Sequence, residues 1–333
     1  MKRVLCFLLI LSFSFGSIVN IKIPKGASAS SIAQILKQEG LIKNELKFKL
    51  LVKTFNKEHN FLPGRFKINS NTSYLNIINQ LQNPKNIQVA KITIPEGFNL
   101  FQINNLLVKK ELLPKDEFYD FATDRSKFIH LLENIPELYN EPELNQLEGF
   151  LFPDTYILGY DMTAEEIIKV MLKRFKNKVL PAYNISKENN TLPKRKDKTM
   201  SFYNIISLAS IIEGEAITAN ERATIAGVFL NRMNKKMILG SCTTVHYARA
   251  LEGLPKVKDL SYADTRIQSD YNTYINAGLP PSPISSPGLA SIEAALNPEK
   301  NNYYFFVSNK DGTHHFSKTE AEHNIWKRRY YKK

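Results

Sequence analysis

The sequence predicts an α+β fold in which a small βα module precedes a larger mixed α/β domain, behind one N-terminal membrane helix. Three observations predict it: an uncharged apolar N-terminal stretch, a strand–turn–helix pattern that occurs twice, and a long second half with apolar helical segments. With 333 residues, 43% of them hydrophobic, the chain can fill one large or two medium domains. Abundant aromatic residues and only two cysteines exclude disordered and disulfide-stapled classes.

Residues 1–19 have the layout of a membrane anchor or an export signal. Lys2 and Arg3 precede an apolar stretch from Val4 to Val19 that contains no charged residue. As a helix this stretch spans about 24 Å, against a hydrocarbon core of about 30 Å, so an anchor and a cleaved signal peptide both remain open. The positive-inside rule keeps the two cations in the cytoplasm and predicts that the rest of the chain is exported.

The composition is basic, with 45 Lys and Arg against 32 Asp and Glu and a formal net charge of +13. Such a chain favours polyanions or anionic surfaces, so nucleic acid, membranes and cell-wall polymers are all candidate partners. An exported chain does not meet nucleic acid, and the sequence contains no recognisable nucleic-acid-binding motif. We therefore exclude nucleic acid as a partner. The two cysteines, Cys6 and Cys242, are too few for a disulfide framework or a cysteine-based zinc site, and no His-Glu-x-x-His pattern occurs. We therefore expect no metal and no cofactor.

A strand–turn–helix pattern occurs twice, at a constant offset of 71 residues (92 − 21). The copies begin with Ile21–Gly26 and Ile92–Gly97, and each continues into an amphipathic helix. In each turn the proline ends the strand, and the glycine supplies the backbone freedom to enter the helix. The first copy, with the segment that follows it, defines a small module over 20–88, and residues 89–333 form the larger domain.

Five further segments are predicted in the second half of the chain. Residues 186–199 are polar and are expected to form an exposed linker, not a binding patch. Residues 202–215 predict a helix that is apolar nearly all round and therefore buried, and Asn220 is expected to cap the next helix. The proline-rich segment 278–288 predicts an irregular loop, and residues 303–308 predict a central strand.

Glu213 is the main catalytic candidate. It continues an apolar stripe of the predicted helix, after Ile206 and Ala209. Burial disfavours the charged form of a carboxyl group, so we expect Glu213 to keep a proton near neutral pH, as an acid that protonates a glycosidic oxygen must. The alternative is a structural ion pair with Arg222 or Arg232, which spacing alone favours.

Other polar residues are weaker candidates. Glu215 lies about 200° around the helix from Glu213 and is either a supporting carboxylate or a solvent-facing one. Glu148 interrupts an apolar run and is either a site carboxylate or a residue that stabilises a turn. His314 follows a glycine and either binds substrate or is a structural histidine, which is the commoner outcome.

Five sequence blocks together resemble one known family. They are Leu147–Tyr156, Leu208–Glu215, Ala226–Met233, Tyr271–Pro281 and Gly312–Ser317. In order and spacing they resemble the endolytic murein transglycosylases of the MltG (YceG-like) family, and the likeness runs from the N-terminal segment to near the C-terminus. The resemblance implies a membrane anchor, a LysM-like subdomain at 20–88 and a YceG-like catalytic domain at 89–333. It implies a single-pass protein of the cell inner (cytoplasmic) membrane with its catalytic part on the periplasmic, extracytoplasmic side.

The resemblance also implies a reaction. The family cleaves the β-1,4 bond between N-acetylmuramic acid and N-acetylglucosamine in nascent peptidoglycan strands, leaves a 1,6-anhydromuramic end and so terminates glycan elongation. Glu213 matches the family's catalytic glutamate, which is implied to protonate the leaving oxygen; it or a partner is then the base for the muramic 6-hydroxyl. One carboxylate can serve both steps, unlike in an ordinary two-carboxylate glycosidase. The implied partners are peptidoglycan strands, the cytoplasmic membrane and penicillin-binding proteins.

The matched blocks imply a set of residues that bind or support the substrate: Glu148, Glu215, Asn231, Arg232, Thr244, Tyr247, Tyr271, Asn272 and His314. One block departs from the family. Where the family commonly has Asp-Pro-Thr-Val, this chain has Cys242-Thr243 before Thr244, so an acidic residue and a proline are missing. Thr244 and Tyr247 keep their matched places, so we expect the loop to persist, with weakened or rearranged activity if the aspartate orients substrate.

Two other functions remain open from the sequence. The chain could bind peptidoglycan without cleaving it, with Glu213 in a structural role, or it could be a muramidase-type hydrolase that uses water as acceptor. The chemical form of the released muramic end separates the enzymes, because transglycosylation leaves an anhydro end and hydrolysis a reducing end. A binding protein releases no product.

Overall fold

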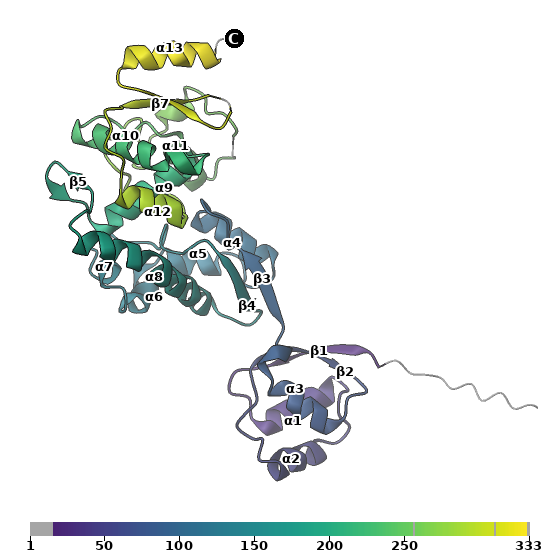
Figure 1. Cartoon of the computed structure of the whole chain (residues 1–333). Coiled ribbons are helices and arrows are strands. Elements are labelled where there is room, and N and C mark those ends of the chain that lie inside the picture. Colours follow the sequence, from purple (N-terminus) through teal and green to yellow (C-terminus); the bar gives the residue numbers. More distant parts are fainter. Residues whose placement is uncertain (1–15, 256, 310, 332–333) are drawn as a thin grey trace, which may run out of the picture. The chain divides into compact units, whose positions relative to one another are not determined.

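The computed structural model describes residues 16–255, 257–309 and 311–331 (Figure 1). Most of the segment predicted as a membrane anchor or export signal, residues 1–15, lies outside this range. Ile18 and Val19, the last residues of the apolar stretch, belong to strand β1 (Ile18–Ile23). Within the described ranges, no helix has both the length and the apolar character that a membrane crossing requires.

The chain divides into two compact units. The first comprises the chain up to Ala90 together with Ile157–Asp161, and the second comprises Lys91–Tyr156 and the chain from Met162 onward. The division falls within β3 (Val89–Thr93) and β4 (Thr155–Gly159), which pair with each other. Helices are combined with small two-stranded sheets, so the mixed α/β composition predicted from the sequence is confirmed.

The first unit has its own apolar core between an antiparallel strand pair and three helices. β1 pairs antiparallel with β2 (Gly64–Asn69), and the inward-facing side chains of both strands, such as Ile21 and Phe66, pack against the helices. Each helix follows a Ser or Asn whose side chain accepts a backbone hydrogen bond in the first turn. The helices are α1 (Ala29–Gln38), α2 (Glu45–Thr54) and α3 (Tyr74–Leu81), followed by the short 3₁₀ turn η1 (Pro84–Asn86).

Both copies of the repeat form the predicted strand, turn and helix. β1 leads into α1, and β3 leads into α4 (Leu100–Lys109). Gly26 and Gly97 have φ angles of 76° and 77°, in the left-handed region that favours glycine. The turns differ at the residue between proline and glycine, which is Lys25 in the first copy and Glu96 in the second.

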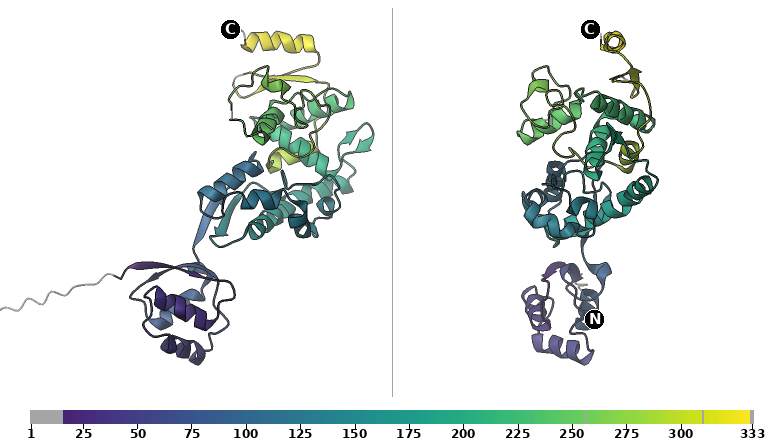
Figure 2. Two further views of the ribbon diagram at one scale, coloured as in Figure 1. Left: turned by 180° about the vertical axis from the view of Figure 1, so that it is seen from behind. Right: turned by 90° about the vertical axis from the view of Figure 1, so that its left-hand side faces the viewer.

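The second unit is mostly helical and is built around α9 (Phe202–Glu215), whose bounds are the predicted ones. Almost every residue from Phe202 to Ile212 is buried, as its apolar sequence predicts. Helices α7, α10, α11 and α12 all contact α9 (Figures 1 and 2). The helices of this unit, besides α4 and α9, are α5 (Glu117–Ala122), α6 (Arg125–Phe128), α7 (Pro136–Tyr139), α8 (Ala164–Glu188), α10 (Arg222–Asn234), α11 (Cys242–Leu251), α12 (Leu289–Leu296) and α13 (Glu320–Tyr331), with the 3₁₀ turns η2 (Ile129–Leu132), η3 (Ala219–Glu221) and η4 (Asp264–Arg266).

Three predictions for this unit are wrong in detail. Helix α8 continues to Glu188, and β5 (Lys194–Arg195) and β6 (Lys198–Thr199) form a hairpin where a linker was expected. Asn220 does not cap a helix, because it lies within η3 and α10 begins after that turn. Strand β7 (Phe305–Ser308) is not central, since among the described residues it pairs with β8 (His314–Ser317) alone and α13 packs against it. The irregular loop over 278–288 is confirmed.

Candidate active site

Glu213 lies in the last turn of α9 with its side chain 8% exposed. Its Oε2 accepts a hydrogen bond from the backbone N–H of Gly288 at 2.9 Å, and its Oε1 lies 3.7 Å from Nη2 of Arg222 on α10. Arg222 donates through Nε to Ser291 Oγ at 3.0 Å, which fixes the guanidinium beside the carboxylate. The carboxylate thus meets one hydrogen-bond donor and one positive charge. The ion pair that the sequence left open is therefore present, and the apolar surroundings predicted for Glu213 are only part of its environment.

The proline-rich loop 278–288 brings Gly288 to this position by running along α9. Near the start of the helix, the Tyr203 hydroxyl donates to the Pro281 carbonyl at 3.0 Å. Further along, the backbone N–H of Ile284 donates to Ser210 Oγ at 3.0 Å. Later residues of the loop thus contact later residues of α9, and these contacts hold the irregular loop along the helix toward Glu213.

A second carboxylate, Glu96, lies at the same place. The turn that carries it is held against the loop, because Gly97 donates its N–H to the Ser286 carbonyl at 2.8 Å and Ser286 donates to the Phe98 carbonyl at 2.7 Å. A Cβ built on Gly288 would lie 2.1 Å from Oε1 of Glu96, so this carboxyl group occupies the space beside the glycine backbone.

Glu96 was not among the residues predicted from the sequence. Burial first, and then the negative charge of Glu213, raise the pKa of Glu96, while Arg222 acts in the opposite direction. One signal could have found it: the two copies of the Pro-x-Gly turn share their backbone geometry but differ in charge, with Lys25 in one and Glu96 in the other.

A cavity of about 380 Å³ opens beside Glu213. Gly97 and Gly214 both line it, and a Cβ on Gly97 would lie 3.7 Å from Cγ of Glu213. Helix α11 supplies polar side chains to the same cavity, among them Thr243, His246 and Tyr247. The cavity therefore borders Gly214, the chain neighbour of Glu213 in α9, and offers polar groups that can bind a hydroxyl-rich ligand.

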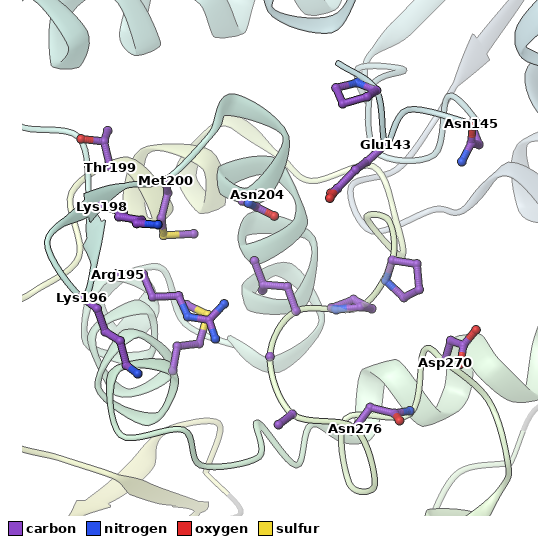
Figure 3. A pocket seen from close by; sticks show the side chains of 17 residues that line it. Glu143, Asn145, Arg195, Lys196, Lys198, Thr199, Met200, Asn204, Asp270 and Asn276 are labelled. Atoms are coloured by element: carbon purple, nitrogen blue, oxygen red, sulfur yellow. The ribbon is translucent and has the colours of Figure 1, made fainter.

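A larger groove, of about 1270 Å³, lies near the start of α9 (Figure 3). Figure 3 shows Arg195 from the β5–β6 hairpin and Glu143 pointing into it from opposite sides, with Asn204 of α9 between them. Nine residues separate Asn204 from Glu213, which at 100° per residue puts them on opposite faces of the helix. The smaller cavity is therefore the candidate active site, despite its size.

Comparison with known proteins identifies the family. The family model described as the YceG-like family matches residues 21–329. The chain belongs to the YceG-like family. The resemblance stated from the five sequence blocks is thus confirmed.

The curated relatives of this YceG-like chain share one name. This chain is 35% identical over 319 residues to the "Endolytic murein transglycosylase" of Bacillus subtilis, and the alignment covers 94% of this chain and 84% of that protein. It is 30% identical over 326 residues to the protein of the same name from Streptococcus pneumoniae strain D39, covering 92% of this chain and 57% of that protein. A 2.6 Å crystal structure of a YceG-like protein from Listeria monocytogenes matches with a TM-score of 0.62 and 35% identity, over 93% of this chain and 99% of that one.

In this YceG-like chain, Glu215 faces away from Glu213. Its Oε1 accepts a hydrogen bond from Ser241 Oγ and lies 3.5 Å from the backbone nitrogen and Oγ1 of Thr243. Thr243 also packs on α9, since a Cβ on Gly214 would meet its Cγ2. Cys242, the other residue that departs from the family pattern, has its Sγ 3.2 Å from the Tyr274 hydroxyl. Glu215 therefore holds the start of α11 against α9.

Glu148 is completely buried and joins two walls of the cavity. Its Oε2 accepts hydrogen bonds from the backbone N–H of Leu100 at 3.0 Å and from the Tyr247 hydroxyl at 3.1 Å. Its Oε1 has no hydrogen-bond partner among the described residues. Burial raises the pKa of Glu148 to about 8, and the bonds from Leu100 and Tyr247 only partly oppose this shift. Glu148 thus ties the start of α4, next to the Glu96 turn, to α11.

Tyr271 and Thr244 lie behind the cavity wall, which Tyr247 helps to form. The rings of Tyr247 and Tyr271 have centroids 4.9 Å apart, and the Tyr271 hydroxyl lies 2.8 Å from Ser282 Oγ in the proline-rich loop. Thr244 is buried and donates to the Ser241 carbonyl at 2.8 Å. These side chains join α11 to the loop, and Tyr247 also lines the cavity.

Four predicted residues are bonded to other parts of the second unit. Asn231 donates to the Tyr303 carbonyl at 3.0 Å, and Arg232 donates through its guanidinium to backbone carbonyls of the segment before β7 and of the segment after α10. Asn272 is buried and donates to the Thr265 carbonyl at 3.0 Å. His314 Nδ1 lies 2.9 Å from Glu221 Oε2. The structure does not bring these four side chains to Glu213, and their contacts are those of residues that hold the fold.

Proposed function

We propose that this protein is an endolytic murein transglycosylase, an enzyme that cleaves the bond between N-acetylmuramic acid and N-acetylglucosamine within nascent peptidoglycan strands. The product carries a 1,6-anhydromuramic end, which ends elongation of the strand. Relatives with that name align with more than nine-tenths of the chain. The observation that carries the proposal is the carboxyl group of Glu213, nearly buried, beside a polar cavity and facing a guanidinium and a backbone N–H.

In the proposed reaction Glu213 gives its proton to the glycosidic oxygen as the bond to C1 of the muramic residue breaks. The 6-hydroxyl of the same residue attacks C1 and returns its proton to the carboxylate, so no water is consumed. Arg222 and the Gly288 N–H stabilise the negative charge that Glu213 carries between these two transfers. The ion pair with Arg222 and the hydrogen bond from Gly288 are thus proposed to take part in the reaction as well as in the fold.

The supporting residues are proposed to act in two ways. Tyr247 lines the cavity and is proposed to contact the sugar. Glu148 holds Tyr247 in position by accepting a hydrogen bond from the tyrosine hydroxyl group. Thr244, Tyr271 and Glu215 hold α11 and the proline-rich loop in place around the cavity. For Asn231, Arg232, Asn272 and His314 the proposed role is to maintain the fold that carries Glu213.

The location and partners of the enzyme are part of the proposal. Lys2, Arg3 and the apolar stretch after them support a single-pass protein of the cell inner membrane with its catalytic part on the periplasmic, extracytoplasmic side. The first unit is proposed as a LysM-like module that binds peptidoglycan, and penicillin-binding proteins are the proposed partners. Protease treatment of intact spheroplasts tests the topology: digestion from outside supports it, and protection equal to that of a cytoplasmic marker contradicts it.

The experiment that tests the activity compares the full-length protein with its Glu213→Gln variant on purified peptidoglycan strands. The amide keeps the size of the side chain but holds no transferable proton, so product release should fall by a factor of at least about a thousand. Circular dichroism and thermal unfolding control for folding. A folded variant with undiminished product would contradict the assignment, and a wild-type protein that binds strands without cleaving them would favour a binding function.

A further inference from the structure

The proposed reaction leaves Glu96 without a role, although its carboxyl group meets the same glycine as the catalytic one. Gly288 donates its N–H to Oε2 of Glu213 at 2.9 Å. The position of a Cβ on that glycine lies 2.1 Å from Oε1 and 2.7 Å from Oε2 of Glu96. The two carboxyl groups therefore lie against one backbone residue, brought there from α9 and from the turn before α4.

The charges around this glycine do not balance. Arg222 supplies one positive charge and faces Glu213, whereas Glu96 has neither an ion-pair partner nor a hydrogen-bond donor within the described residues. Two carboxyl groups so close together resist being ionised at the same time, because each negative charge disfavours the other. The raised pKa of Glu96, for which burial is the first cause and the charge of Glu213 the second, agrees with this geometry.

Other titratable groups nearby lie on the elements that pack around α9. They are Glu215 of α9 itself, bonded to Ser241, and His246 and Arg249 of α11, which line the cavity. Arg249 is paired with Asp264, so its charge is already compensated. Among the described residues, Glu96 is the carboxylate whose side chain shares Gly288 with Glu213.

We propose that Glu96 is a positioning residue for the reaction: its carboxyl group shares one transferable proton with Glu213. The inference rests on the proposed catalytic role of Glu213. In the resting enzyme the two carboxyl groups hold one proton between them, with Arg222 balancing the remaining negative charge. Without Glu96 the pair loses the group that shares this proton, and Arg222 and the Gly288 N–H are left against Glu213 alone.

The proton count supports this role through the whole cycle. When the C1–O4 bond breaks, Glu213 gives its proton to O4 and becomes negative beside Glu96. The two adjacent charges make Glu213 a stronger base, so it takes the proton of the 6-hydroxyl as the C1–O6 bond forms. One bond is broken, one is formed, and the pair ends with the single proton that it had at the start.

The test is the pH dependence of kcat in the full-length Glu96→Gln variant. Glutamine keeps the shape of the side chain but removes the charge, so the alkaline limb of the profile should move about one pH unit lower. At pH values above this limb the variant should be about tenfold slower than the wild type, and near the acidic limb the two should agree within about twofold. Glu96→Asp, which keeps the charge, should retain most of the wild-type limb.

Glu293→Gln is the matched control, because it removes an exposed carboxylate from α12, a helix that also packs on α9. It should leave the profile unchanged. An alkaline limb that stays in place in Glu96→Gln, or a kcat lowered by the same factor at every pH, would overturn the proposal. The second result would mean that Glu96 only supports the structure.

A titration followed by NMR separates this proposal from the proposed function. With carbon-13-labelled glutamate in the full-length wild-type protein, the carboxyl groups of Glu96 and Glu213 should respond to pH in two linked steps, and Glu96→Gln should leave a single step. This readout needs no substrate, so linked titration in a protein without transglycosylase activity would refute the function and keep the coupling. Independent single-step titrations in the wild type would overturn the coupling even if the variant fails to fold.

Discussion

The backbone N–H of Gly288 lies 2.9 Å from Oε2 of Glu213, although 75 positions separate the two residues in the chain. The contact depends on the loop 278–288, which follows α9 from Tyr203 to Glu213. The carboxyl group of Glu96 lies on the same glycine. Three segments that are distant in sequence thus meet at one backbone residue, and this meeting point is where the proposed chemistry takes place.

A methyl group at position 288 should disturb the site more than the fold. Gly288 has φ −71° and ψ 165°, which alanine adopts without strain, but the new Cβ would occupy the place of the Glu96 carboxyl group. Because that group is the end of a flexible side chain, we expect Gly288→Ala to cost less than about 1 kcal/mol in the free energy of unfolding. Activity above neutral pH should fall about tenfold, as for the loss of the Glu96 charge.

A double-mutant cycle checks this interpretation. If Gly288→Ala acts by displacing Glu96, combining it with Glu96→Gln should reduce kcat little further than either change alone. A double variant whose loss equals the product of the two single losses would show that the glycine and the carboxylate act independently.

Glu215 should differ sharply from Glu213 when each is changed to glutamine. Glu215 accepts a hydrogen bond from Ser241 at the start of α11, and a glutamine oxygen can still accept it. We expect Glu215→Gln to keep kcat within about tenfold of the wild type, while Glu215→Ala should lower the free energy of unfolding by about 1–3 kcal/mol by leaving the Ser241 hydroxyl unpaired. Urea unfolding and product release measure both effects. An inactive but stable Glu215→Gln protein would make Glu215 the catalytic residue.

Glu148 should make the stability of the protein depend on pH. Its pKa rises from 4.5 to about 8 on folding because the side chain is buried, so between these values the folded state binds more protons than the unfolded state. Stability should therefore be highest at the acidic end of this window and fall as the pH rises through about 8, by an amount on the order of a few kcal/mol. Free energies of unfolding in urea at several pH values measure the slope.

Replacing Glu148 by glutamine should remove most of this slope, because the amide does not titrate. The glutamine oxygen can still accept from Leu100 and Tyr247. Glu293→Gln, an exposed carboxylate on α12, should keep the wild-type slope. Equal slopes in the wild type and in Glu148→Gln would contradict the assignment of the effect to Glu148.

Local sequence signals predicted the elements that depend on local physics. The bounds of α9 follow from an apolar run, and the turns at Gly26 and Gly97 follow from the backbone freedom that glycine supplies. The end of α8 and the hairpin at 194–199 were missed, because a polar, lysine-rich segment is also compatible with a linker. The position of Asn220 was a plausible cap, but a 3₁₀ turn precedes α10 there.

The site was less predictable, because its geometry depends on contacts between distant segments. Glu213 could be chosen from the resemblance, whereas spacing alone favoured a structural ion pair with Arg222 or Arg232, and the pair with Arg222 exists. Glu96 lies in a turn whose role depends on Gly288, which no local pattern connects to it. The complete burial of Glu148 likewise depends on α4 and α11 closing around it.

The most direct measurement is the mass of the muramic ends that the full-length protein releases from peptidoglycan strands in heavy-oxygen water. If Glu213 transfers its proton to the leaving oxygen and the 6-hydroxyl is the acceptor, the released ends will be anhydro forms without heavy oxygen, and a folded Glu213→Gln variant will release none. Reducing ends that carry one heavy oxygen, or anhydro ends released undiminished by the variant, would contradict the account.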